Sequence, residues 1–211
     1  MIEADHMIYR RFFLKITAAS ALVLAMPLGW RAAWAQSDDQ ATDFIKRLSD
    51  RLTSVVNGPG TEAEKKAQMK QIIDHDVDVD VVGRFCLGRY WNIATPEQRQ
   101  EYLRLFHDVL VKSITSHLGE YAGVHITIGR TVPGDEQATV SSTVERPNNP
   151  PTDVKWIVSI STGAPKVVDV VAEGTSLRLT QREDYASYLM HNGSSVQKLI
   201  AAMKQQLAQN S

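Results

Sequence analysis

The chain has 211 residues, 43% of them hydrophobic, and its 23 basic and 24 acidic residues give a formal net charge of -1. This length and composition can supply a sizeable core and argue against intrinsic disorder, while the balanced charge lacks the basic field that non-specific nucleic-acid binding needs. The single cysteine excludes an internal disulfide and a Cys-based zinc or iron–sulfur site.

The first 35 residues have the layout of a secretory signal. An arginine pair at 10–11 precedes a mildly apolar run over 16–30, and the small-x-small sequence at 33–35 offers a cleavage site. The apolar run is shorter than the roughly 20 residues that a membrane-spanning helix needs, and Pro27 interrupts it. We therefore predict a signal peptide over 1–35, with an uncleaved membrane anchor as the alternative.

The arginine pair also bears on the export route. Followed by Phe, Leu and Lys, it is similar to the twin-arginine motif, with Tyr9 where that motif more often has Ser or Thr; an ordinary Sec signal is the alternative. Met7 could equally be the true start. Cleavage after Ala35 removes four basic and two acidic residues, which leaves a mature region, 36–211, with a net charge of -3.

Helical periodicity dominates the chain up to Gly123. Thr61 with Glu64, and Thr95 with Gln98, form capping-box patterns that mark two helix starts. The second of these starts opens a stripe of apolar residues about five turns long. Helices are predicted over 38–56, 61–75, 79–87 and 95–121.

After Gly123 the hydrophobic period changes from 3.6 to 2, and short turns separate four alternating segments. Strands are expected within 124–128, 138–144, 154–160 and 167–172. Helical spacing returns over 181–191 and 194–207. The sequence therefore predicts a single α+β domain, in which N-terminal helices, a four-stranded antiparallel meander and C-terminal helices follow one another and the long helix crosses one sheet face.

Most patterns that suggest a metal or catalytic site fail when their spacing is tested. The acidic run 76–80 resembles the start of a calcium loop, but Val81 and Leu87 stand where that loop needs Gly and Glu. Short acids that lead into and cap the next helix are a sufficient interpretation. No two histidines of the mature region share one face of a helix at the i, i+4 spacing of a zinc pair, and Cys86 beside Phe85 is interpreted as a buried, inert thiol.

Asp169 is the one acid that supports an enzymatic alternative. It lies within an apolar strand, 167–171, where a carboxylate could face a cavity and act as a general base. Strand alternation could equally place it on the wet face or let it pair with an arginine. The enzymatic hypothesis requires Asp169 to point into a closed pocket. A third class, an adaptor without ligand, predicts a tightly filled core instead.

Three segments carry a resemblance to a known family. They are Leu87-Gly88-Arg89-Tyr90-Trp91, the helix start Thr95-Pro96-Glu97-Gln98-Arg99, and Glu173-Gly174-Thr175-Ser176-Leu177. Together with the order of elements they resemble the MlaC family, the periplasmic phospholipid-binding proteins of the Mla lipid-transport pathway, also called the toluene-tolerance auxiliary family. The resemblance covers nearly all of the mature chain.

The resemblance implies a periplasmic carrier rather than an enzyme, with a curved NTF2-like sheet, an apolar cavity and no cofactor other than its cargo phospholipid. The implied partners are an outer-membrane lipoprotein complex and an inner-membrane ABC transporter complex with a membrane-anchored lipid-binding subunit, and the implied role is to maintain outer-membrane lipid asymmetry. The resemblance implies no nucleic-acid partner. A carrier for another lipid, such as a hopanoid, is the related alternative.

The resemblance also turns apolar stripes into candidate lipid contacts, although the same side chains could simply fill a core. The candidates for the cavity wall are Phe106, Leu110, Ile114, Ile126, Ile128, Val140, Val144, Trp156, Val158, Val168 and Val170. Arg84, Arg89 and Tyr90 are the candidates for the cavity mouth, where a guanidinium could meet a lipid phosphate or an acid of a partner. The alternative for these arginines is a structural role, bonded to backbone carbonyls.

Overall fold

The structure is a computed structural model that describes residues 28–161 and 163–209. These residues form six α-helices, two short 3-10 helices and one antiparallel sheet of five strands, which confirms the predicted α+β class with one strand more than expected. Within the described ranges, no helix combines the length and apolar character needed to cross a bilayer. The predicted signal peptide, 1–35, lies mostly outside them, so its cleavage stays a prediction.

Six helical segments precede the sheet. In chain order they are α1 (Leu28–Asn57), α2 (Glu62–Asp76), α3 (Val79–Leu87), η1 (Gly88–Asn92), α4 (Pro96–Thr115) and η2 (Leu118–Tyr121). Both predicted capping boxes are present: the side chains of Thr61 and Thr95 accept from backbone N–H groups three residues on, and the side chains there bond back to the caps. Because each box satisfies donors that a helix start leaves unpaired, α2 and α4 begin where the sequence predicted.

The long helix expected over 95–121 is divided in the structure. α4 ends at Thr115, and η2 begins after Ser116 and His117. The hydroxyl groups of Thr115 and Ser116 each donate to the carbonyl oxygen three residues earlier, which competes with continued helical hydrogen bonding. Apolar spacing runs on through the break, so periodicity alone did not reveal it.

The sheet is a meander in which each strand pairs antiparallel with the next along the chain. Its strands are β1 (His125–Val132), β2 (Gln137–Glu145), β3 (Thr152–Ser159), β4 (Lys166–Ala172) and β5 (Thr175–Ser176). The first four are the predicted strands, whereas β5 is too short for alternation to be recognised. Register shifts between Ile128 and Thr131 and between Ile157 and Val158 interrupt the pairing, as bulges that bend a sheet do.

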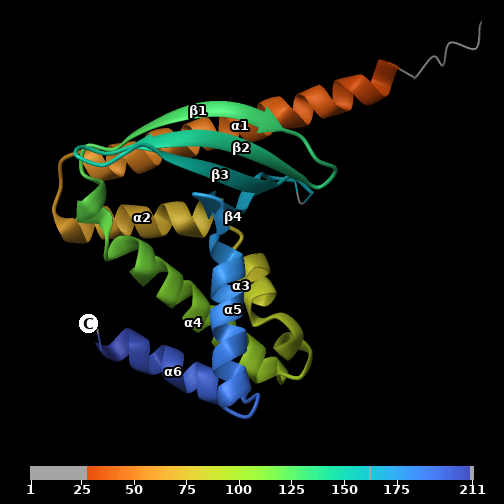
Figure 1. The fold of residues 1–211 in the computed structure, drawn as a ribbon, viewed down its shortest axis with the longest axis vertical. Helices are drawn as coiled ribbons and strands as arrows, with labels where there is room; N and C mark the ends of the chain where they lie inside the picture. The colour runs from red at the N-terminus through yellow and green to blue at the C-terminus, as the bar shows by residue number, and fades with distance from the viewer. Residues whose placement is uncertain (1–27, 162, 210–211) are drawn as a thin grey trace, which may run out of the picture.

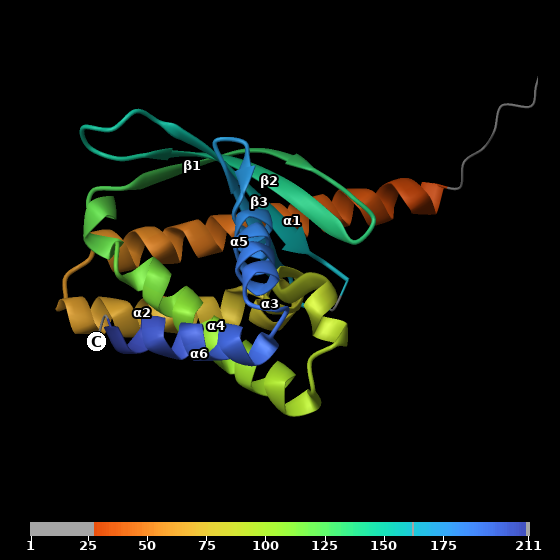
Figure 2. The same cartoon turned by 60° about the horizontal axis from the view of Figure 1, so that its bottom comes forward.

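Two helices complete the chain, α5 (Leu177–His191) and α6 (Val196–Gln209). α5 begins before the predicted start at Gln181 because the hydroxyl of Ser176 caps it by accepting from the backbone N–H of Leu179. In Figure 1, α5 runs from the sheet to α6, and Figure 2 shows α1 between the sheet and α2.

These elements enclose two apolar cores. One lies between the inner face of the sheet and helices α1 and α2, and the other lies among α3, η1, α4, α5 and α6. In the helical core the rings of Tyr102, Phe106 and Tyr185 have centroids 5.9 to 6.4 Å apart in tilted and edge-to-face contacts. Such contacts add to the energy of area burial, and Val168 of β4 packs into the same core and connects it to the sheet.

The acidic run that fails as a calcium loop has structural roles. Asp78 caps α3 by accepting from the backbone N–H of Val81 at 3.1 Å. Asp76 is only 1% exposed and pairs with the guanidinium of Arg51, while its other oxygen lies 2.7 Å from Nδ1 of His75. The carboxylate of Asp76 thus joins the end of α2 to α1.

A matched pair of isoleucines tests the helical core. Ile200 is fully buried there, at 0% exposure, whereas Ile93 is 64% exposed. We expect Ile200→Ala to lower the free energy of unfolding by about 2–5 kcal/mol, because it removes packed methyl groups and leaves a cavity. Ile93→Ala should change it by less than about 0.5 kcal/mol. Urea denaturation followed by circular dichroism measures both, and equal losses would contradict the assignment of the core.

Candidate functional site

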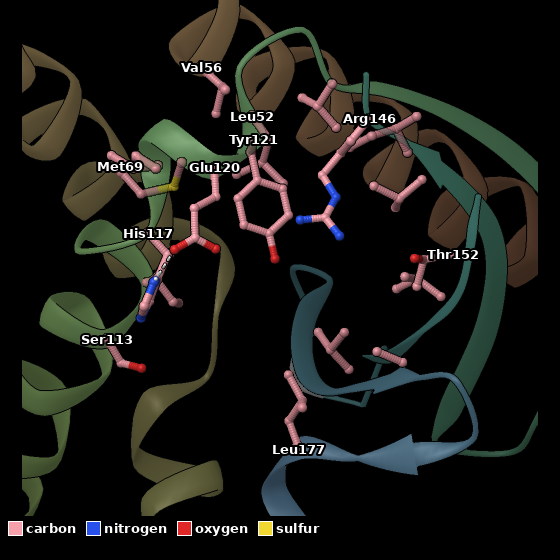
Figure 3. A pocket seen from close by; sticks show the side chains of 18 of the residues that line it. Leu52, Val56, Met69, Ser113, His117, Glu120, Tyr121, Arg146, Thr152 and Leu177 are labelled. Carbon is pink, nitrogen blue, oxygen red and sulfur yellow. Dashed lines mark hydrogen bonds and ion pairs between the residues drawn. The ribbon is translucent and has the colours of Figure 1, made fainter. Parts of the chain in front are cut away.

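A cavity of about 600 Å³ lies between the inner face of the sheet and the helices (Figure 3). Helices α1, α2, α4 and η2 form one wall, and strands β1 to β4 form the other. Most of the lining side chains are apolar. They are Leu52, Val56, Met69, Ser113, Ile114, His117, Leu118, Glu120, Tyr121, Val124, Ile126, Val144, Arg146, Thr152, Val154, Trp156, Val170, Ala172 and Leu177.

The cavity is a continuation of the sheet core. Toward the start of β2, Ala138 and Val140 are fully buried against α1 and α2, as is Val158 opposite them on β3. Farther along the same inner face, Val144 and Trp156 are only partly buried and line the cavity. The helices therefore pack directly on one end of the inner face and stand away from the other end, where the cavity lies.

Trp156 gives the open end a large apolar surface without an unpaired polar group. Its indole Nε1–H donates to the hydroxyl of Ser142 at 2.9 Å, and that hydroxyl donates to the carbonyl of Val154 at 3.4 Å. Ser142 is buried on the inner face. Because the indole N–H is satisfied inside the sheet, the ring can stand in the cavity wall as an apolar group.

Four of the lining residues that reach solvent come from η2, the residue before it and the segment after β2, and we call this set the mouth: His117, Glu120, Tyr121 and Arg146. The guanidinium of Arg146 stacks on the ring of Tyr121, with its carbon 4.9 Å from the ring centroid. Nδ1 of His117 lies 2.8 Å from a carboxylate oxygen of Glu120. The mouth thus places one cationic and one anionic side chain beside an apolar interior.

The eleven predicted wall residues divide into two groups. Five lie on the cavity wall: Ile114, Ile126, Val144, Trp156 and Val170. The structure places the other six elsewhere: Leu110, Ile128, Val140 and Val158 pack in the covered part of the sheet core, and Phe106 and Val168 lie in the helical core. Alternation indicates which face a side chain is on, but not where along that face the helices pack directly on the sheet, which separates the sheet-core residues from the cavity wall. Val168 differs because the register shift between Ile157 and Val158 pairs Val158 with Val167, so that Val167 takes the place in the sheet core.

Several lining residues escaped the sequence interpretation. Leu52 and Val56 come from the end of α1 and Met69 from α2, a helix in which most of the residues are polar. Tyr121 and Arg146 flank the β1–β2 hairpin, at the end of η2 and just after β2. The sequence offered one indication of the mouth, which is the position of Arg146 at the start of the proline-rich segment 146–151.

The residues predicted for the mouth lie outside this cavity. Arg89 and Tyr90 line a second depression of about 450 Å³, formed by η1 and α5. The guanidinium of Arg89 donates to the hydroxyl of Tyr90 at 3.0 Å, and that of Arg84 lies 5.4 Å from the ring centroid of Trp91. Both arginines therefore stack on aromatic rings, and among the described residues neither donates to a backbone carbonyl. A neighbouring arginine does so instead: the guanidinium of Arg99 donates to the carbonyl oxygen of Trp91 at 2.8 Å.

Asp169 is enclosed by donors rather than exposed to the cavity. Its carboxylate accepts from the backbone N–H groups of Val170 at 2.8 Å and Arg178 at 3.1 Å, and from the hydroxyl of Ser176 at 2.6 Å. Nε of Arg178 lies 3.4 Å from it. Asp169 is 7% exposed and does not line the cavity, so the structure realises the arginine-paired alternative. Its carboxylate joins β4 to β5 and to the start of α5.

The other reactive groups are also in structural positions. Cys86 is 1% exposed, and burial raises the pKa of its thiol to about 12, which keeps it protonated at neutral pH. Among the described residues, no cluster of three or more His, Cys, Asp or Glu side chains could hold a metal ion.

Comparison with known proteins gives two findings. A family model described as MlaC protein matches residues 38–205. Among solved structures, the chain is similar to a phospholipid-binding protein from Ralstonia solanacearum in complex with a phospholipid, with 22% sequence identity and a TM-score of 0.71. That likeness covers 81% of this chain and 98% of the Ralstonia chain, and it shows that the two share a fold.

The structural role of Asp169 can be tested by the effect of an Asp169→Asn substitution on stability. We expect Asp169→Asn to lower the free energy of unfolding by about 1.5–3 kcal/mol, because charge-assisted hydrogen bonds from four donor groups are weakened or lost. Asp135→Asn, in the exposed β1–β2 turn, is the matched control and should leave stability within about 0.5 kcal/mol. Urea denaturation measures both. If Asp169→Asn is as stable as the control, the structural role is wrong.

Proposed function

The chain belongs to the MlaC family, and on this premise we propose that it is a phospholipid carrier of the periplasm, exported through a cleaved N-terminal signal. The observation that carries the proposal is the open end of the sheet core, an apolar cavity whose charged groups gather at the mouth. A phospholipid has the same division, with apolar acyl chains joined to a charged headgroup. We assign the acyl chains to the cavity and the headgroup to the mouth, where it stays in contact with water.

The volume and the apolar lining of the cavity support acyl chains as its ligand. Its volume of about 600 Å³ is within the roughly 300–1,000 Å³ that is common for ligand sites. Each methylene group that moves from water into an apolar site gains about 0.8 kcal/mol, so the roughly 30 methylenes of a diacyl lipid gain about 24 kcal/mol before binding costs are subtracted. This gain makes unaided release into water slow, so a carrier of this kind must transfer its cargo while docked to a partner.

Docked transfer implies one partner at each membrane. We propose an outer-membrane lipoprotein complex and an inner-membrane ABC transporter complex, whose membrane-anchored lipid-binding subunit would exchange phospholipid with this protein. Net movement between them would maintain the lipid asymmetry of the outer membrane. Family membership and the phospholipid bound in the Ralstonia protein support this assignment over an enzymatic one, as does the enclosure of Asp169.

The identity of the cargo can be tested directly. We expect native mass spectrometry of the protein, purified without detergent from its own periplasm, to detect a complex whose added mass is that of one phospholipid. Lipid extraction and fragmentation then identify the class and would distinguish a hopanoid from a phospholipid. Protein that is folded and free of lipid after this preparation would contradict the carrier proposal.

Filling the cavity should displace the acyl chains. Val144 lies on the cavity wall, and Val132 on the neighbouring strand is 45% exposed and does not line the cavity. We expect Val144→Trp to reduce co-purified lipid at least severalfold, because the indole occupies space that the chains need, whereas Val132→Trp should retain lipid as the unmodified protein does. Phosphorus analysis of extracted lipid measures the difference.

A thermal unfolding scan of both variants accompanies this measurement, so that a loss of lipid is assessed only for folded protein. Folded Val144→Trp protein that keeps its full complement of lipid would show that the acyl chains bind elsewhere.

A further inference from the structure

Two side chains of opposite charge meet at the mouth from different elements. Arg146 follows β2, and Glu120 lies in η2. Both line the cavity, and Figure 3 shows the ring of Tyr121 between the guanidinium of Arg146 and the carboxylate of Glu120. Acyl chains are apolar and need no charged partner, so the binding of acyl chains alone does not explain why these two charges lie at the mouth.

The guanidinium of Arg146 is oriented but not neutralised. It stacks on Tyr121 at 4.9 Å, and among the described residues it has no carboxylate within ion-pair distance and no acceptor for its N–H groups. Stacking holds the guanidinium plane while leaving its N–H edge available. A planar edge of this kind matches two oxygens of a phosphate group.

The carboxylate of Glu120 is likewise oriented but only partly used. One oxygen lies 2.8 Å from Nδ1 of His117, which holds the side chain in place, and within the described ranges no residue donates to the second oxygen. The Glu120 side chain is 64% exposed and is therefore at the rim, where a headgroup would lie. A carboxylate oxygen accepts hydrogen bonds and attracts a cation, so its natural partner is a primary ammonium.

We propose that the mouth selects phospholipids with a zwitterionic headgroup, in which the phosphate binds Arg146 and the ammonium group binds Glu120. This inference rests on the proposed carrier function and names the lipid class of the same cavity. A phosphatidylglycerol headgroup offers the phosphate but no cation, so Glu120 would face an anionic lipid without compensation. A phosphatidylethanolamine headgroup satisfies both side chains.

The expected preference is modest because the mouth is open to water. Ion pairs at such exposure contribute enough for about a twofold to fivefold preference for the ethanolamine lipid. The acyl chains, which are common to both lipids, supply most of the affinity. Selection at the mouth therefore changes which lipid is bound, with little effect on how much lipid is bound.

A competition experiment measures this preference. Lipid-free protein is incubated with vesicles that contain equal amounts of phosphatidylethanolamine and phosphatidylglycerol with identical acyl chains, and the bound lipids are counted by native mass spectrometry. We expect the protein to bind about twofold to fivefold more of the ethanolamine lipid. Glu120→Gln should bring the ratio to about one with total lipid unchanged, because the amide keeps the size of the side chain and loses its charge.

Two further variants distinguish the roles. Glu136→Gln is the matched control, since Glu136 is exposed in the β1–β2 turn and does not line the cavity, and it should keep the ratio of the unmodified protein. Arg146→Gln should keep the preference for the ethanolamine lipid, because both lipids contain the phosphate and Glu120 is unchanged; a ratio of one in this variant would contradict the assignment of the preference to Glu120. Thermal unfolding confirms that each variant is folded.

The outcomes separate this inference from the carrier function on which it rests. A ratio of one in the unmodified protein, or a preference that survives in Glu120→Gln, overturns headgroup selection and leaves the carrier proposal intact. An unmodified protein that binds neither lipid overturns the carrier proposal, and headgroup selection with it.

Discussion

Incomplete coverage of the inner sheet face by α1 and α2 is the constraint on which the other features depend. Where those helices pack directly on the sheet, Ala138, Val140 and Val158 are removed from water; toward the other end, where the same helices form the opposite wall of the cavity, Val144 and Trp156 remain only partly covered. When an apolar ligand covers surface of this kind, the free energy of the system falls, because the surface is removed from water. The same side chains that would complete a core are therefore available to acyl chains.

A protein with an unfilled end of one core needs stability from elsewhere. The helical core among α3 to α6 supplies it, with the contacts of Tyr102, Phe106 and Tyr185, and it lies apart from the cavity. Buried carboxylates join the parts: Asp76 connects α2 to α1, and Asp169 connects β4 to the start of α5. Neither carboxylate lines the cavity, so these connections do not require a ligand in it.

The interior of the cavity and its mouth offer a ligand two different kinds of interaction, apolar contact and charged hydrogen bonds. Apolar contact in the cavity is non-directional and accepts any acyl chain of suitable size, whereas hydrogen bonds to charged groups such as Arg146 and Glu120 are directional, which is the basis of the proposed headgroup selection. The break in the helix after Thr115 is what brings η2, and with it Glu120 and Tyr121, to the rim. A local competition for backbone carbonyls at the end of α4 therefore helps to set the position of the mouth.

The sequence by itself determined the helix starts at the two capping boxes, the four main strands and the family, because capping, alternation and short motifs depend on residues close together in the chain. It also indicated which face of the sheet would be apolar. Only the tertiary structure decided that Val144 and Trp156 line a cavity while Val140 and Val158 fill a core, that Arg146 rather than Arg89 is at the mouth, and that Asp169 is enclosed by donors. Each of these depends on where α1, η2 and α5 pack, which is a property of contacts between distant segments that no local pattern contains.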